Sequence, residues 1–212
     1  MVIRVGQINA LRSATAAANL EIIMRERNLD ILCLQGPFCY KGKVQGYNFP
    51  DLIKIQPQNC DKAWVAAVVK NDKLEVLTSV GNECEHVMCF KVLTGNSEFI
   101  IINAYCQYSL PLEGFLDKIE NTINSFQPEK VLVIVDSYLK SELWFDKVTD
   151  PKSVILEEFI YDLTILNKPD NPPTFMNGSG ESNIDITLAT ENLAEHVKAW
   201  KVDSSCTTSD HN

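Results

Sequence analysis

The sequence predicts an α/β fold in which two mixed β-sheets pack face to face with helices outside, a four-layer α/β sandwich. Sheet-forming segments occur in both halves of the chain, and helical segments alternate loosely with them. The chain has 212 residues, of which 45% are hydrophobic. That is enough to bury one sizeable core. We therefore expect residues 1–212 to form a single domain.

The first half predicts one helix among several strands. Residues 3–8 alternate apolar and polar side chains, which is typical of a half-buried strand, and residues 14–27 carry apolar side chains at helical spacing. The continuous apolar run at 31–34 predicts an interior strand. Further strands are predicted over 65–69, 74–80, 87–93 and 99–104.

The pattern changes after Leu112, where apolar residues recur at spacings of three and four as far as Phe126. This spacing predicts an amphipathic helix. Residues 131–135 predict a buried strand. Asp150-Pro151 predicts a helix start, with an N-cap and a first-turn proline. That helix is expected to turn five apolar side chains inward: Val154, Ile155, Leu156, Phe159 and Ile160.

The last part of the chain predicts two strands and a long loop. The strands are expected over 184–188 and 197–202. Residues 167–182 are rich in Pro, Gly and Asn and predict the longest irregular loop, a kind of segment that is often functional.

Charge and composition exclude several classes of protein. Nineteen basic and 28 acidic residues give a net charge of −9, which disfavours unspecific coating of nucleic acid. No window approaches the ~20 apolar residues of a membrane span, and no signal peptide is evident, so we expect an intracellular protein without a membrane partner. The seven cysteines include no C-x-x-C pair, which favours buried reduced thiols over disulfides or a zinc site.

Polar residues gather where the predicted strands end. Each of them alone is most often a turn or cap residue, so only their joint order is informative. They are Gln7, Asn9, Tyr105, Asp136, Asp185, Asp210 and His211.

Eight short motifs extend this order over nearly the whole chain. They resemble the exonuclease-endonuclease-phosphatase superfamily and, within it, the apurinic-like endonuclease domain of site-specific insect non-LTR retrotransposons. The motifs are VGQIN (5–9), LDILCLQ (29–35), NAYCQYS (103–109), SELW (141–144), PTF (173–175), GESNIDITL (180–188), WKV (200–202) and SDH (209–211).

The resemblance implies hydrolysis of a phosphodiester with a divalent cation, Mg²⁺, and a base. It also implies the four-layer sandwich and roles for six residues. His211 would donate a hydrogen bond to the phosphate, and Asp210 would orient the His211 ring. Asp136 would align or deprotonate the attacking water, and Tyr105 would lie at the phosphate or leaving group. Asn9 would help to hold the metal, and Asp185 would support the site.

Two central positions depart from the family pattern. Gly36 stands where the family has the Mg²⁺-binding Glu, and Tyr138 stands where it has an Asn of the phosphate site. The usual metal ligand is therefore missing, and only Asn9 and Asp210 remain as weak candidate ligands. Glu181 or Asp30 could supply an oxygen to a displaced ion. We expect Mg²⁺ binding to be weakened or lost.

These departures leave two function hypotheses. The first is a domain that has lost most or all catalysis and now binds a protein or nucleic acid. The alternative is an active Mg²⁺-dependent endonuclease that nicks double-stranded target DNA to prime reverse transcription. We expect the protein to be nuclear. If the two departures cause the loss, Gly36→Glu with Tyr138→Asn should restore nicking, provided that position 36 leaves room for a carboxylate.

A basic rim for DNA is weakly indicated. Five lysines fall in predicted loops and could form one rim, although solvated surface lysine is the more common situation. They are Lys41, Lys43, Lys62, Lys140 and Lys147. Trp64 and Trp144 are expected in the core, and no role is assigned to His86 or His196. The family continues with a short apolar strand after the motif that ends at His211, so we expect a trimmed end or a longer polyprotein.

Overall fold

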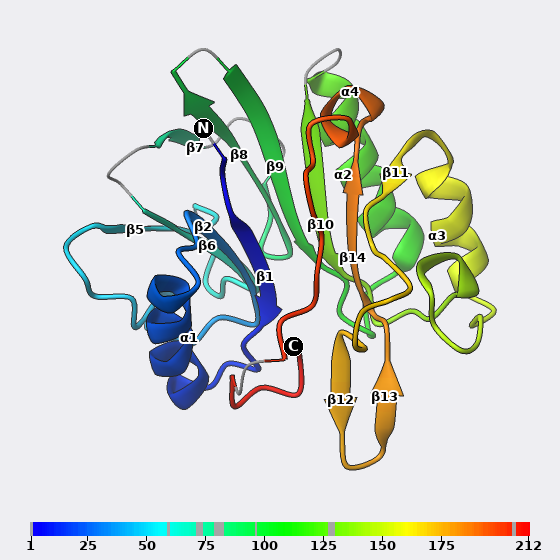
Figure 1. Cartoon of the computed structure of the whole chain (residues 1–212), viewed down its shortest axis with the longest axis horizontal. Helices are drawn as coiled ribbons and strands as arrows, with labels where there is room; N and C mark the ends of the chain where they lie inside the picture. Colours follow the sequence, from blue (N-terminus) through cyan, green and yellow to red (C-terminus); the bar gives the residue numbers. More distant parts are fainter. Residues whose placement is uncertain are drawn as a thin grey trace.

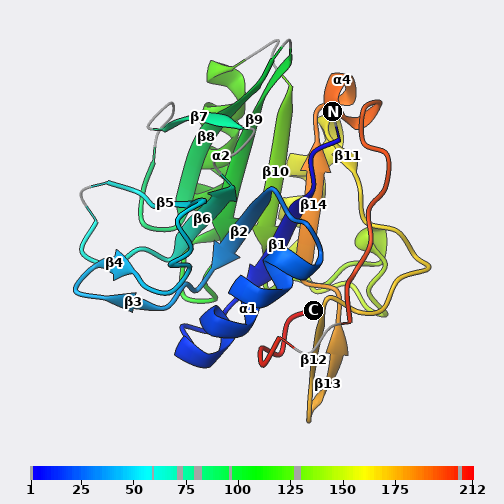
Figure 2. The same cartoon turned by 60° about the vertical axis from the view of Figure 1, so that its left-hand side comes forward.

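The computed structural model describes residues 2–58, 60–70, 74–78, 83–95, 97–126, 130–204 and 207–212. Two large sheets face each other, with helices on their outer sides (Figures 1 and 2). This confirms the predicted four-layer sandwich. The first sheet has the order β1 (Val5–Asn9), β2 (Ile31–Gln35), β6 (Val65–Lys70), β5 (Leu52–Ile55).

The second sheet is longer. Its order is β11 (Thr164–Ile165), β14 (Asp185–Ala189), β10 (Val131–Asp136), β9 (Ser97–Tyr105), β8 (Val87–Thr94), β7 (Glu75–Thr78). Both sheets are mixed, because β1 and β2 run parallel, as do β9 and β10, while the neighbouring pairs are antiparallel. Residues 79 and 80 of the predicted strand at 74–80 lie outside the described residues.

Alternation along the strands separates the layers. In β10, Leu132 and Ile134 pack between the two sheets, while the intervening valines pack beneath the helices on the outer side. In β1, Val5 faces the second sheet and Ile8 packs against the first helix. Side chains two residues apart share a face, so Asp136 and Asn9 also point between the sheets.

The helices of the described residues cover the outer sides of the two sheets (Figure 1). Helix α1 (Ala14–Glu26) begins where the Ser13 hydroxyl accepts a hydrogen bond from the Ala16 backbone N–H, and it buries Leu20 and Met24. Helix α2 (Leu112–Ser125) buries the predicted stripe against the second sheet. Helix α3 (Ser153–Phe159) packs beside it.

The start of α3 corrects the sequence prediction. The Asp150 carbonyl accepts a hydrogen bond from the Ser153 N–H in a turn that contains Pro151, so the helix begins only at Ser153. Leu156 is buried as expected, but Val154 is 48% exposed. Val154 is two residues from Leu156, about 200° around the helix, and therefore points away from the core.

The C-terminal quarter differs from the prediction in two places. Half of the expected loop at 167–182 is a β-hairpin, β12 (Phe175–Asn177) and β13 (Gly180–Ser182). Residues 197–202, predicted as a strand, follow the short helix α4 (Glu191–Ala194) without a strand ladder. Trp200 instead packs on the core between the sheets and donates its indole N–H to Thr187. Side-chain packing thus replaces strand pairing.

Several smaller features complete the fold. Strands β3 (Cys39–Tyr40) and β4 (Lys43–Val44) form a small hairpin (Figure 2), and two 3-10 turns, Glu142–Trp144 and Ile160–Asp162, flank α3. The described cysteines are reduced, as predicted, but only Cys33, Cys89 and Cys106 of them are buried, whereas Cys39, Cys60 and Cys84 are half-buried. Cys206 lies outside the described residues. Within the described part of the chain, no helix is long and apolar enough to cross a membrane.

Candidate active site

Four strand ends and one strand start meet at a single edge of the sandwich. Parallel strands finish at the same edge, so Asn9 ends β1 beside Gln35 of β2, and Tyr105 ends β9 beside Asp136 of β10. Antiparallel β14 begins there with Asp185, directly opposite Asp136. Side-chain polar groups from both sheets therefore converge between the layers.

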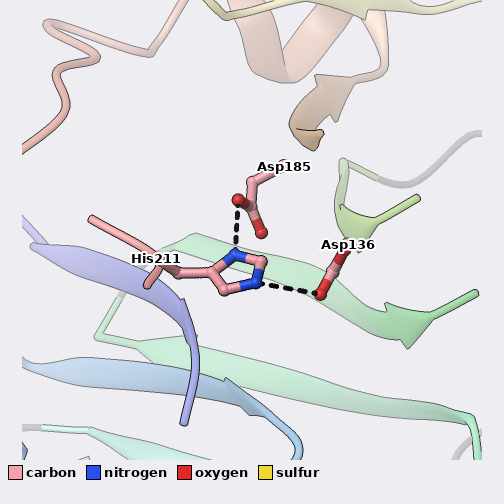
Figure 3. A group of neighbouring side chains, drawn as sticks. All are labelled: Asp136, Asp185 and His211. Carbon is pink, nitrogen blue, oxygen red and sulfur yellow. Dashed lines mark hydrogen bonds and ion pairs between the residues drawn. The ribbon is translucent and has the colours of Figure 1, made fainter. Parts of the chain in front are cut away.

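The centre of the site is a chain of contacts through His211 (Figure 3). Its Nδ1 lies 2.9 Å from Asp185 Oδ2, and its Nε2 lies 3.9 Å from Asp136 Oδ2. Asn9 Nδ2 donates to the same oxygen of Asp136 at 2.7 Å. His211 and Asp136 are 1% and 0% exposed. The structure thus brings together Asn9, Asp136, Asp185 and His211.

The hairpin β12–β13 holds His211 in place. His211 pairs with Phe175 as an isolated β-bridge, and the edge of one ring faces the other with centroids 5.0 Å apart. The Ser209 hydroxyl donates to the Asn9 carbonyl and accepts from the His211 N–H. The C-terminal segment is therefore fixed both to the hairpin and to the end of β1.

Burial and neighbouring charges shift both ionisable centres. Burial opposes the imidazolium, but the charge of Asp185, its hydrogen bond and the charge of Asp136 raise the pKa of His211 to about 9. Burial and the charge of Asp185 raise the pKa of Asp136 to about 7, against the opposing effects of His211 and Asn9. The two neighbouring carboxylates therefore favour the imidazolium form of His211.

Tyr105 reaches the site but is engaged by Tyr138. Their hydroxyl groups lie 3.0 Å apart, and burial raises the pKa of both phenols. Tyr138 has a φ of +54°, a left-handed conformation that a bulky side chain rarely adopts and that Asn tolerates well. The phenol packs on the core between the sheets, so it fills space at the edge where Asp136 lies.

Gly36 lies against Asn9. Its φ is +52°, and a Cβ built at this position would come 2.6 Å from Asn9 Oδ1. Asn9 cannot easily retreat, because it donates to Asp136 and its Oδ1 accepts the Leu11 N–H at 2.9 Å. The room required for a restored Glu at position 36 is absent in this conformation.

The expected role of Asp210 is corrected by the geometry. Asp185, not Asp210, contacts the His211 ring nitrogen, while Asp210 is exposed and uses its backbone carbonyl to accept from Met176. The two suggested substitute ligands also lie elsewhere. Glu181 pairs with Lys147, and Asp30 accepts the Arg4 N–H.

The donor set fits Mg²⁺ poorly. Among the described residues, one cluster offers ligand atoms within 4.8 Å of one another: Asp136, Asp185 and His211. Mg²⁺ prefers six oxygen ligands in octahedral geometry, whereas this cluster contributes an imidazole whose two nitrogens face carboxylates. Position 36 supplies no side-chain oxygen. The acidic and histidine side chains could still hold a cation, but not in the way that the family resemblance implies.

Sequence reasoning missed a cluster of side chains beside Tyr105. The ring of His86, to which no role was assigned, lies 5.7 Å from that of Trp64 and 6.4 Å from that of Tyr105, and the latter two are 5.8 Å apart, so the three ring centroids form a triangle. Arg12 and Lys62 lie 4.6 Å and 3.9 Å from the Trp64 ring centroid. Their spacing in sequence carries no signal of this contact, because it depends on strand pairing. Trp144 is fully buried, as predicted.

The chain is similar in sequence to proteins of retrotransposable elements. A family model described as endonuclease-reverse transcriptase matches residues 99–212. The chain is 26% identical over 185 residues to the Retrovirus-related Pol polyprotein from type-1 retrotransposable element R1 of Bradysia coprophila, covering 81% of this chain and 18% of that protein. It is 22% identical to the Putative 115 kDa protein in type-1 retrotransposable element R1DM of Drosophila melanogaster, covering 97% and 21%. The chain thus spans about a fifth of these relatives' length.

The fold is also similar to those of solved endonuclease structures. The endonuclease domain of TRAS1, a telomere-specific non-LTR retrotransposon, superposes with a TM-score of 0.86 at 25% identity, over 100% of this chain and 95% of that one. The AP endonuclease LMAP from Leishmania major has a TM-score of 0.73 at 13% identity, over 99% and 85%, which shows the shared fold alone. The match over more than half of the chain shows that it belongs to the endonuclease-reverse transcriptase family, within the exonuclease-endonuclease-phosphatase superfamily.

Proposed function

We propose that this retrotransposon endonuclease-type domain has lost most or all phosphodiester hydrolysis and acts by binding a protein or nucleic-acid partner. The observation that carries this proposal is at Gly36. A side chain there would meet Asn9 Oδ1 at 2.6 Å, so the position lacks both a carboxylate and the space for one. Without that ligand, the metal that the family uses is bound weakly.

Tyr138 supports the same conclusion. The Tyr138 hydroxyl contacts the Tyr105 hydroxyl. Tyr105, which would face a phosphate or leaving group, is therefore already engaged. Removing groups that stabilise the transition state lowers the rate tenfold for each ~1.36 kcal/mol. Loss of the cation and of the phosphate donor at position 138 would together lower turnover by orders of magnitude.

The alternative, an active endonuclease, is favoured by the intact contacts among Asn9, Asp136, Asp185 and His211. A carboxyl group with a pKa of about 7, as in Asp136, suits a general base at neutral pH. A protonated His211 would serve as a hydrogen-bond donor to a phosphate. These residues would support hydrolysis if a cation were recruited in another way.

A plasmid-nicking assay separates the two functions. Supercoiled plasmid is incubated with the chain and either Mg²⁺ or Mn²⁺, beside Asp136→Ala and His211→Ala prepared identically. We expect nicking by the parent chain to equal that by both variants. Nicking that exceeds the Asp136→Ala background and requires the divalent cation would refute the loss of activity and establish the alternative.

The class of partner requires a second measurement. DNA binding would depend steeply on salt, because phosphate contacts release counterions. Negligible, salt-insensitive affinity for duplex DNA would favour a protein partner, which the net charge of −9 also favours. We propose a nuclear location, because an endonuclease domain of this family would meet its target DNA in the nucleus.

A further inference from the structure

We infer that Gln7 is a positioning residue, which fixes the Asp185 carboxylate and through it the ring of His211. The inference rests on the proposed function only in taking His211 as the centre of the site. Its starting point is β1, where Gln7 and Asn9 are two residues apart and so point to the same side. That side faces the second sheet.

Each of these two amides contacts one carboxylate of the opposite sheet. Asn9 Nδ2 donates to Asp136 at 2.7 Å, and Gln7 Nε2 donates to Asp185 Oδ1 at 3.4 Å. The two carboxylates are paired residues of neighbouring strands, and His211 contacts both. One strand of the first sheet thereby holds the two groups that flank the imidazole.

Gln7 donates a hydrogen bond to the Asp185 oxygen that His211 does not contact. His211 Nδ1 contacts Oδ2, whereas Gln7 contacts Oδ1. The terminal torsion of an Asp side chain has a broad, shallow energy profile, so one contact alone leaves the carboxylate free to rotate. A donor on the second oxygen restricts this rotation and therefore the direction of the His211 hydrogen bond.

Gln7 is itself oriented by contacts on the core side. Its Oε1 accepts from the Thr187 hydroxyl at 3.5 Å, and that hydroxyl accepts the Trp200 indole N–H at 3.0 Å. Thr187 and Asp185 are two residues apart on β14 and share its inner face. With its carbonyl oxygen engaged by Thr187, the amide presents its N–H₂ group to Asp185.

The test follows the Nδ1 proton of His211 by NMR of the full chain. The chain has three histidines, and the signal that disappears in His211→Gln identifies the proton. Gln7→Met keeps the length and neutrality of the side chain but removes the donor. Gln45→Met is the matched control, because Gln45 donates to the Lys43 carbonyl in the separate β3–β4 region.

We expect Gln7→Met to shift this resonance and to raise its solvent-exchange rate at least about fivefold, while Gln45→Met leaves both unchanged. Parent-like shift and exchange in folded Gln7→Met would overturn the inference. If Gln7→Met does not fold, Thr187→Val replaces it. This near-isosteric change should raise exchange by a smaller factor, and a parent-like rate there would overturn the inference equally.

The result is independent of turnover. Plasmid nicking by the parent chain would refute the proposed loss of activity and leave the NMR comparison intact. A space-filling role for Gln7 alone would leave the His211 resonance unmoved in Gln7→Met, since methionine fills nearly the same volume.

Discussion

Gly36→Ala tests whether the backbone at position 36 has become incompatible with any side chain. A left-handed φ costs an alanine about 1–2 kcal/mol. The new Cβ would also displace Asn9 Oδ1, from which it would be 2.6 Å away. Above the pKa of Asp136, which is about 7, losing the hydrogen bond from Asn9 to the ionised Asp136 costs about 1.5–3 kcal/mol. We therefore expect a total loss of stability of about 3 kcal/mol.

The assay is urea and thermal unfolding of four proteins: the parent, Gly36→Ala, Asn9→Ala and the double variant. For a chain of this length, 1 kcal/mol corresponds to roughly 2–4 °C, so Gly36→Ala should lower the Tm by roughly 6–12 °C. In the Asn9→Ala background the clash is absent, and only about 1–2 kcal/mol should remain. The two effects should thus be less than additive.

Two results would refute this reasoning. The first is a Gly36→Ala protein within about 0.5 kcal/mol of the parent, which would show that the loop accommodates a side chain freely. The second is additivity within about 0.5 kcal/mol, the agreement expected of independent sites. Either result would restore the expectation that Gly36→Glu with Tyr138→Asn recovers nicking; the geometry reported above predicts instead that this double variant remains inert.

Three further predictions concern charge, metal and packing. The pKa of His211 is raised to about 9, so its contribution to the free energy of unfolding is complete below pH ~6.5 and should be lost as pH rises through about 9. In unfolding titrations, His211→Gln should abolish this dependence of the free energy of unfolding on pH. The raised pKa of Asp136, about 7, adds an earlier fall in stability between pH ~4 and 7. Calorimetric titration with Mg²⁺ should show no saturable binding with a dissociation constant below ~10⁻⁴ M, and a tighter site lost in Asp136→Ala would contradict this. Asn103 accepts from Gln35 at 2.7 Å and donates to two carbonyls of the first sheet; Asn103→Leu should cost at least about 2 kcal/mol, and a neutral effect in urea unfolding would show that this link does not stabilise the sandwich.

The regular core was predictable because local patterns coincide with tertiary burial. The stripe from Leu112 to Ile123 packs on the second sheet as its spacing indicates, and the apolar run 131–135 is a buried strand. Residues 197–202 show the limit of such reasoning. Their pattern resembles a strand, but whether a strand forms depends on a neighbour with free ladder positions, which local sequence does not specify.

The sequence by itself determined the family, through the order of its motifs, and it predicted the sandwich. It also predicted that Asn9, Asp136, Asp185 and His211 meet at one edge, because strand ends are marked by local patterns. Only the tertiary structure decided which carboxylate holds His211. Asp210 is adjacent in sequence, but backbone direction turns it outward, and Asp185 arrives from an antiparallel strand. The structure alone also decided that Gly36 faces Asn9 at a left-handed φ. Both outcomes depend on how two sheets, distant in sequence, place their side chains in one shared space.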